Sequence, residues 1–207
     1  MPSAWAQRWF VERVEHPQLP LLVATDESGA VTAVVLNAAS EVLTAERDRR
    51  PPDARAELRP RVGAPSSIAR QLRAYLYGEW SAMGPGRSFE YRGAALGTEF
   101  EREVWTRVAA IGFGETRSYG ALASAMGRPG AARAVGRANG ANPLPLLVPC
   151  HRVIGSQGQL TGFAGGLPAK RWLLAHESPQ SELFAEAGAH DSNDVNASRP
   201  SSAGGLA

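Results

Sequence analysis

The stretch of sequence that decides the fold covers residues 131–155 and reads AARAVGRANGANPLPLLVPCHRVIG. Its first ten residues are almost all small, and we expect them to form a short helix. Just upstream, YGALASAM over residues 119–126 predicts another short helix, and GRPG over residues 127–130 predicts a tight turn. Two short helices joined by a glycine-containing turn of four residues are typical of a helix-turn-helix motif.

The helix expected over residues 131–140 carries few bulky side chains. Its small residues are Ala131, Ala132, Ala134, Gly136 and Ala138. Such a surface has two explanations, because small side chains allow close packing against another helix and also allow close approach to a nucleic-acid groove. The sequence is compatible with both.

Charge is unevenly distributed along the 207-residue chain. The formal net charge is +2, but residues 116–176 carry seven basic side chains and no acidic one. Residues 1–115 are close to neutral, and residues 177–207 carry five acidic side chains against one basic. A basic block without acids is the electrostatic footprint of a polyanion-binding surface, although a solvated basic face would have the same composition.

Cys150 is the only cysteine, so the chain has no internal disulfide and no all-cysteine zinc site. A lone cysteine is most often a small buried hydrophobic residue. Here Pro149 stiffens the preceding backbone. The cationic side chains of His151 and Arg152 follow directly, which favours a thiolate nucleophile instead.

The side chains of Cys150 and His151 would point to opposite faces of an extended strand. Either a tight turn brings them together or a water molecule relays the proton between them. A histidine base also needs an acceptor that orients its other ring nitrogen. The first acidic residue after the basic block is Glu177, which is either this acceptor or an exposed carboxylate at a helix end.

About the first 90 residues predict a small unit that contains a sheet. LPLLVAT over residues 19–25 and AVTAVVLN over residues 30–37 predict a β-hairpin. Residues 47–66 hold four prolines and show no periodicity, which predicts a loop. Apolar residues at helical spacing predict a helix over residues 67–77, and residues 78–91 are expected to form a linker.

Beyond the linker the pattern is mainly helical. Thr98 and Glu101 match a capping box at the start of a helix that extends to about residue 111. Residues 155–166 hold five glycines, which predicts a loop whose backbone can approach a ligand. Residues 167–177 predict a last helix.

We therefore expect an α+β protein with two domains. Residues 1–92 form a small supporting α/β domain with a short antiparallel sheet, and residues 93–178 form a mainly helical, winged-helix-like domain that carries the helix-turn-helix. Residues 179–207 are polar, small and aperiodic, and we expect a disordered tail. No apolar run reaches the ~20 residues that span a bilayer. The first residues also lack the apolar core of a secretory signal, so the expected location is the cytoplasm.

Residues 97–177 resemble the O6-alkylguanine-DNA alkyltransferase family, the methylated-DNA–protein-cysteine methyltransferases. The motifs that carry the resemblance are PCHRVIG with its upstream NPLP, the segment GETRSYGALASAMGRPGAARAVGRANG, and GFAGGLPAKRWLLAHE. The resemblance implies DNA repair by direct, irreversible transfer of an alkyl group from O6-alkylguanine, with O4-alkylthymine as a further potential substrate. Because a thioether is a poor leaving group, each molecule is expected to act once, and no cofactor is expected.

The family resemblance also implies roles for the reacting residues. Cys150 would accept the alkyl group, and His151 would act through a water as general base, oriented by Glu177. Asn142 would connect the helix-turn-helix to the active-site segment. Tyr119 would lie near the 3′ phosphate and assist protonation of the leaving guanine.

The partner that the resemblance implies is double-stranded DNA containing alkylated guanine, bound through its minor groove by a monomer. The helix over residues 131–140 would be the recognition helix, and Arg133 would replace the flipped nucleotide in the base stack. The expected DNA contacts are Ala131, Ala132, Arg133, Ala134, Gly136, Tyr119 and Arg152.

The resemblance places the alkyl group in a pocket beside the glycine-rich loop. The expected lining consists of Val153, Phe163, Ala164 and Gly165. Many family members have Tyr at the position of Phe163 and Ser at that of Ala164, so the hydrogen bonds of those hydroxyls are not expected here. The N-terminal half holds His16 as its one histidine and no cysteine, and we expect no metal site.

Three other functions are compatible with parts of the pattern. A non-catalytic alkyltransferase-like protein would bind alkylated DNA without transfer, but such proteins lack the acceptor cysteine. A Cys-His hydrolase would need a cysteine at a helix N-terminus and a remote histidine. A winged-helix transcription regulator would bind duplex DNA, and Cys150 would be incidental to that function.

Overall fold

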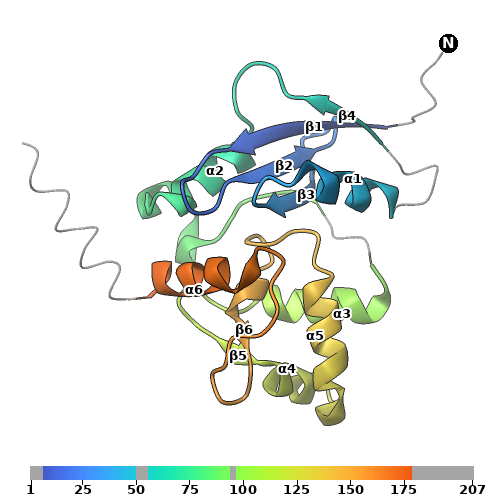
Figure 1. Cartoon of the computed structure of the whole chain (residues 1–207), viewed down its shortest axis with the longest axis vertical. Helices are drawn as coiled ribbons and strands as arrows, with labels where there is room; N and C mark the ends of the chain where they lie inside the picture. The colour runs from blue at the N-terminus through green and yellow to red at the C-terminus, as the bar shows by residue number, and fades with distance from the viewer. Residues whose placement is uncertain (1–6, 50–55, 94–96, 179–207) are drawn as a thin grey trace, which may run out of the picture.

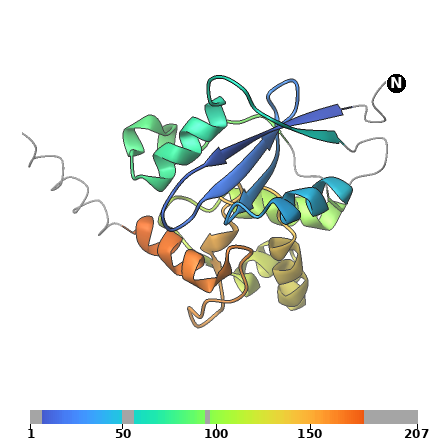
Figure 2. The same cartoon turned by 45° about the horizontal axis from the view of Figure 1, so that its top comes forward.

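The computed structural model describes residues 7–49, 56–93 and 97–178 (Figure 1). A sheet with two helices lies above a mainly helical unit, and Figure 2 shows the strands passing over the helices below. The predicted α+β fold class is confirmed. The tail predicted over residues 179–207 lies outside the described residues.

The first unit is built on a four-stranded sheet with the strand order β3-β2-β1-β4. Its elements are β1 (Gln7–Val14), β2 (Leu21–Thr25), β3 (Val31–Leu36), α1 (Ser40–Asp48), β4 (Ala56–Pro60) and α2 (Ser67–Leu76). The predicted hairpin is confirmed, because β2 and β3 pair antiparallel. Gly29 lies in the turn between them at a φ of 79°, a conformation that glycine adopts without steric cost.

The loop predicted over residues 47–66 is wrong in its second half. Strand β4 pairs there in parallel with β1, so the sheet is mixed at this edge rather than wholly antiparallel. The strand is short, lies at the edge of the sheet and ends at Pro60. Proline is tolerated in that position because an edge strand leaves one row of backbone groups unpaired.

Helix α2 forms where the sequence predicts it. The side chain of Ser66 accepts a hydrogen bond from the backbone N–H of Ala69 and caps the helix. Its apolar face joins the main hydrophobic core together with one face of the sheet. On the other face of the sheet a smaller cluster includes Leu43 of α1. The sheet is therefore covered on both faces.

The segment over residues 78–91 is more ordered than the predicted linker. It contains two turns of 3₁₀ helix, η2 (Trp80–Ala82) and η3 (Pro85–Arg87). Trp80 and Phe89 pack against the main core. The segment closes one side of the core, so the linker prediction is wrong.

The second unit carries the helix-turn-helix. Its elements are α3 (Glu99–Ala109), β5 (Arg117–Ser118), α4 (Tyr119–Ala125), η4 (Pro129–Ala131), α5 (Ala132–Gly140), η5 (Cys150–Arg152), β6 (Val153–Ile154) and α6 (Gly166–His176). The predicted capping box is confirmed, with the Thr98 side chain accepting from the N–H of Glu101. Trp105 of α3 donates from Nε1 to the carbonyl of Ala138 in α5, 2.7 Å away, which holds the motif against α3.

The two units share one hydrophobic core. The main cluster includes Val34 of β3 and Leu72 of α2 as well as Val108 of α3 and Leu173 of α6. The backbone N–H of Val34 also donates to the carbonyl of Pro143 in the second unit, at 3.0 Å. The sheet unit is thus joined directly to the segment that leads to Cys150.

Within the described ranges, no helix has both the length and the apolar character needed to cross a bilayer.

Candidate active site

Cys150 begins a single turn of 3₁₀ helix, η5, that includes His151 and Arg152. The extended backbone expected around the cysteine is absent, because residues 143–147 form bends and turns, Leu146 has a φ of 73°, and Pro149 has φ and ψ of −77° and 64°. The turn is closed by the N–H of Arg152, which donates to the carbonyl of Pro149 at 2.9 Å. With about three residues per turn, neighbouring side chains no longer point to opposite faces. The predicted tight turn is present, but it does not place the thiol in hydrogen-bond contact with the free ring nitrogen of His151, which has no partner among the described residues.

The thiol of Cys150 lies in a buried site, with 5% of the residue exposed. Burial raises the pKa of this thiol, while a hydrogen bond from Asn142 and the charge of Lys170 lower it. Burial alone would leave an unreactive thiol, because it disfavours the charged form. Asn142, Lys170 and the backbone N–H groups of Cys150 and His151 therefore favour the thiolate, whereas the adjacent Arg152, expected from the sequence to do so, does not contribute.

Two asparagines fix the backbone around the nucleophile. Asn142 donates from Nδ2 to the carbonyl of Val148 at 2.8 Å and accepts from the N–H of Leu144 at 3.0 Å. Asn139, in α5, donates from Nδ2 to the carbonyl of Cys150 at 3.2 Å. The connection between the helix-turn-helix and the active-site segment, which was expected from Asn142 alone, is thus made by Asn139 as well. The sequence analysis missed this residue, although it is a polar side chain in a helix of small residues.

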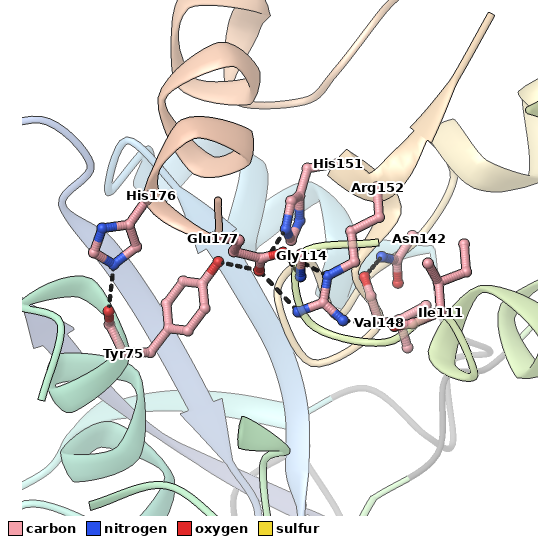
Figure 3. Close-up of polar contacts among 9 residues, drawn as sticks. All are labelled: Tyr75, Ile111, Gly114, Asn142, Val148, His151, Arg152, His176 and Glu177. Atoms are coloured by element: carbon pink, nitrogen blue, oxygen red, sulfur yellow. Dashed lines mark hydrogen bonds and ion pairs between the residues drawn. The ribbon is translucent and has the colours of Figure 1, made fainter. Parts of the chain in front are cut away.

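His151 is fully buried, and its Nε2 lies 3.0 Å from Oε1 of Glu177 (Figure 3). Burial lowers the pKa of His151 and outweighs the opposite effect of Glu177, so the imidazole is neutral at neutral pH. A carboxylate can only accept, so Nε2 carries the proton and Nδ1 keeps its lone pair. Nδ1 has no hydrogen-bond partner among the described residues, which suits a general base.

Glu177 is the residue on which the buried polar groups converge (Figure 3). Only 2% of it is exposed. Oε1 accepts from the hydroxyl of Tyr75 at 2.6 Å, and Arg152 donates to both carboxylate oxygens, from Nη2 at 2.8 Å and from Nε at 2.7 Å. Burial raises the pKa of Glu177, but hydrogen bonds from His151 and Arg152 hold it well below its usual range. The orienting acceptor is therefore ionised and buried, not an exposed helix-end carboxylate.

Arg152 does not lie where the sequence analysis expected it. Its side chain is buried, and besides Glu177 it binds the carbonyl of Ile111 from Nη1 at 2.6 Å. A guanidinium committed to these partners is not available to a DNA phosphate. The structure argues against the predicted DNA contact, and the role of Arg152 is to neutralise the buried carboxylate.

Lys170 is a buried cation that the sequence analysis missed. Its residue exposure is 0%, and Nζ donates to the carbonyls of Val153 at 2.7 Å and Thr161 at 3.1 Å. Burial lowers the pKa of Lys170, although the charge of Cys150 raises it. Helical periodicity could have revealed it, because Lys170 and Leu173 lie three residues apart on one face of α6, and Glu177 continues that spacing just after the helix ends.

The predicted pocket residues differ in burial and contacts. Val153 is fully buried, and the ring of Phe163 stands edge-on to the His151 ring with centroids 6.3 Å apart. A Cβ at Gly165 would come within 3.1 Å of the Phe163 ring, so glycine permits this close approach. Ala164 is exposed beside them.

Tyr119, at the start of α4, connects the helix-turn-helix to the glycine-rich loop. Its hydroxyl accepts from Oγ1 of Thr161 at 3.0 Å. Its ring lies 3.7 Å from the position that a Cβ of Gly136 would occupy, so α5 approaches it closely at this point.

The small residues of α5 serve two surfaces. Ala138 is buried against α3, and Gly136 faces Tyr119, so packing explains these two. The partly or fully exposed residues of α5 include Ala132, Arg133, Ala134 and Arg137, whereas Ala131, just before the helix, packs partly against the main core. This exposed side of α5 leaves room for a closely approaching ligand. In the described ranges, no group of three or more His, Cys, Asp or Glu side chains could hold a metal ion.

Comparisons with known proteins agree with this arrangement. A family model described as "6-O-methylguanine DNA methyltransferase, DNA binding domain" matches residues 99–179. The methylated-DNA–protein-cysteine methyltransferase of Shigella flexneri is 42% identical over 172 residues, which cover 82% of this chain and 96% of that protein.

Two solved structures are similar over most of their length. The O6-methylguanine methyltransferase of Mycobacterium tuberculosis has a TM-score of 0.65 at 35% identity, covering 85% of this chain and 99% of that one. A structure of the Mycobacterium tuberculosis OGT in complex with DNA has a TM-score of 0.63 at 36% identity, covering 84% and 99%. The predicted family is confirmed: this chain belongs to the methylated-DNA–protein-cysteine methyltransferases.

Proposed function

We propose that this protein repairs alkylated DNA by transferring the alkyl group of O6-alkylguanine irreversibly to Cys150. The observation that carries the proposal is the buried chain of contacts from Glu177 through His151 to the turn that holds Cys150. Family membership supports the same chemistry, and the family model supports DNA as the partner.

In the proposed reaction His151 takes the thiol proton on Nδ1 through a bridging water. The sulfur of Cys150 then attacks the alkyl carbon, an S–C bond forms, and the bond from that carbon to O6 breaks. The electron pair stays on the guanine, whose anion takes a proton from the Tyr119 hydroxyl, and the proton held by His151 returns through water to the tyrosine oxygen. The products are S-alkylcysteine and unmodified guanine, so atoms and charge balance without a cofactor.

Lys170 and Asn142 support the first step, because both favour the thiolate in a site where burial opposes it. Glu177 stays ionised and stabilises the imidazolium that forms on His151. The alkyl group would lie against Val153 and Phe163. No second cysteine is present to displace the thioether, so each molecule would react once.

The test is the mass of the intact protein after mixing with an oligonucleotide that contains O6-methylguanine. We expect a gain of one methyl group on Cys150, which saturates at one equivalent of oligonucleotide. Continued turnover, or a methyl group on a different residue, would contradict the proposal. The rival non-catalytic reading predicts binding with no mass change.

We further propose that α5 is the recognition helix, that it docks in the minor groove as part of a monomer, and that Arg133 fills the gap left by the flipped nucleotide. The exposed side of α5 supports this geometry, since small residues surround the cationic side chains of Arg133 and Arg137 there. A minor groove about 6 Å wide admits a helix only where side chains are small.

Replacing Arg133 with alanine should slow repair of duplex DNA by about 30-fold, because extrusion of a base costs a few kcal/mol without the inserted side chain. Reaction with free O6-methylguanine should change by less than about twofold, because no base has to be flipped. Arg137→Ala is the matched control, as it removes an exposed arginine from the same helix. Equal losses on duplex and free base in Arg133→Ala would refute the finger role.

A further inference from the structure

Tyr75 lies in α2, in the sheet unit, yet its side chain reaches the candidate active site (Figure 3). Its hydroxyl donates to Oε1 of Glu177 at 2.6 Å. Its main-chain carbonyl accepts a hydrogen bond from Nε2 of His176 at 2.7 Å. Two consecutive residues at the end of α6 therefore hold both ends of one tyrosine, which is 1% exposed.

The carboxylate of Glu177 occupies an unfavourable position that requires strong donors. It follows the last residue of α6, and the negative end of a helix dipole repels a negative charge. Arg152 supplies a compensating charge, but Oε1 is shared among the donors. The Tyr75 hydroxyl lies closer to Oε1 than Nε2 of His151 does, at 2.6 Å against 3.0 Å.

We propose that Tyr75 is a positioning residue for the transfer reaction: it fixes the Glu177 carboxylate that orients His151 and shares its negative charge, so that the imidazole stays a neutral base. This inference rests on the proposed function. It also assigns a chemical role to the sheet unit, which completes the hydrogen-bond chain behind the nucleophile. Tyr75 acts through Glu177 and does not touch the substrate.

The groups that face His151 come from several elements. Burial lowers its pKa first, Glu177 raises it, and the positive charges of Arg152 and Lys170 lower it. The Cys150 thiol lies in the same turn. Phe163 adds an uncharged ring.

Without the Tyr75 hydroxyl, Oε1 of Glu177 would be left to His151 and Arg152. The carboxylate would then attract the proton of His151 more strongly, and the pKa of the imidazole would rise. A larger fraction of His151 would be protonated below neutral pH and unable to accept the thiol proton.

The test is Tyr75→Phe, which removes only the hydroxyl. In a plot of the single-turnover rate of methyl transfer against pH, the fall on the acid side should move to higher pH by roughly one unit. The variant should therefore be several-fold slower than the wild-type protein near pH 6 and equal to it near pH 8. The same shift should appear in the NMR titration of His151 in histidine-labelled protein, with the signal assigned from a His151→Gln variant. A purely structural loss would lower the rate equally at all pH values.

Tyr91→Phe is the matched control, because it removes the hydroxyl of a half-buried tyrosine in the same part of the chain. Its pH profile should equal that of the wild-type protein. An unshifted acid limb and an unshifted His151 titration in Tyr75→Phe would overturn the inference. The NMR measurement needs no substrate, so a wild-type protein that fails to methylate Cys150 would refute the proposed function, while the titration still decides the role of Tyr75.

Discussion

Replacing Cys150 with serine should abolish methyl transfer, with a rate at least ~10³-fold below that of the wild-type protein. A serine hydroxyl has nearly the same size as the thiol but ionises far less readily, and the groups that favour a thiolate here do not offset that difference. The measurement is intact-protein mass after incubation with the methylated oligonucleotide. The variant should show no added methyl group at any excess of DNA.

Binding provides the control for Cys150→Ser. The exposed side of α5 lies apart from the buried thiol, so the variant should bind methylated duplex with an affinity close to that of the wild-type protein. Transfer that survived the substitution would exclude Cys150 as the acceptor. Sequence-specific duplex binding that ignores alkylation in both proteins would favour the transcription-regulator reading instead.

Replacing Glu177 with glutamine should lower both stability and activity. Glutamine keeps the shape, but it leaves the buried guanidinium of Arg152 without its charge partner. Removing one member of a buried ion pair costs about 3–5 kcal/mol, a large part of the total stability of a typical domain. The free energy of unfolding, measured by urea titration, should fall accordingly, and methyl transfer should slow because His151 loses its orienting anion.

The loss of stability in Glu177→Gln should depend on pH in a defined direction. The pKa of Glu177 is held below its usual range in the folded protein. Its stabilising contribution is therefore fully present above the unfolded pKa of about 4.3 and is lost as the pH falls through the lower folded value. The difference in the free energy of unfolding between the wild-type protein and Glu177→Gln should become smaller in that acidic range.

Glu115→Gln is the matched control for Glu177→Gln. Glu115 forms a surface ion pair with Arg117, and both side chains are 54% exposed. Exposed pairs of this kind contribute little, so the control should change stability by less than about 1 kcal/mol. Equal effects of the two substitutions would show that the buried network around Glu177 is not a special source of stability.

The sequence predicts well the elements that depend on local patterns. The hairpin of β2 and β3, the capped helices α2 and α3, and the helix-turn-helix all follow from turn residues and periodicity within a short window. The contact of His151 with Glu177 could be suspected because a base needs an acceptor and the acid-free block ends at that glutamate.

The remaining features depend on contacts that no local pattern records. Arginine is a residue type expected to bind DNA phosphates, but the side chain of Arg152 points instead to the buried carboxylate of Glu177. Strand β4 is short and proline-bounded, and only its pairing with β1 makes it a strand. Tyr75 looks like an ordinary core residue of an amphipathic helix until Glu177 is placed against its hydroxyl.

The hydrogen bonds of Glu177 also bear on the order of events in folding. Its carboxylate binds Tyr75 across 102 positions of the chain and the Gly114 N–H across 63 positions. Contacts between residues far apart in sequence carry a larger loop-closure entropy and form slowly compared with a helix or a hairpin. The turn at Cys150 is local, but the network that orients its base is completed only after the C-terminal end of the folded region meets helix α2. In a newly made molecule, we therefore expect the turn at Cys150 to form before the contacts that make the thiol reactive.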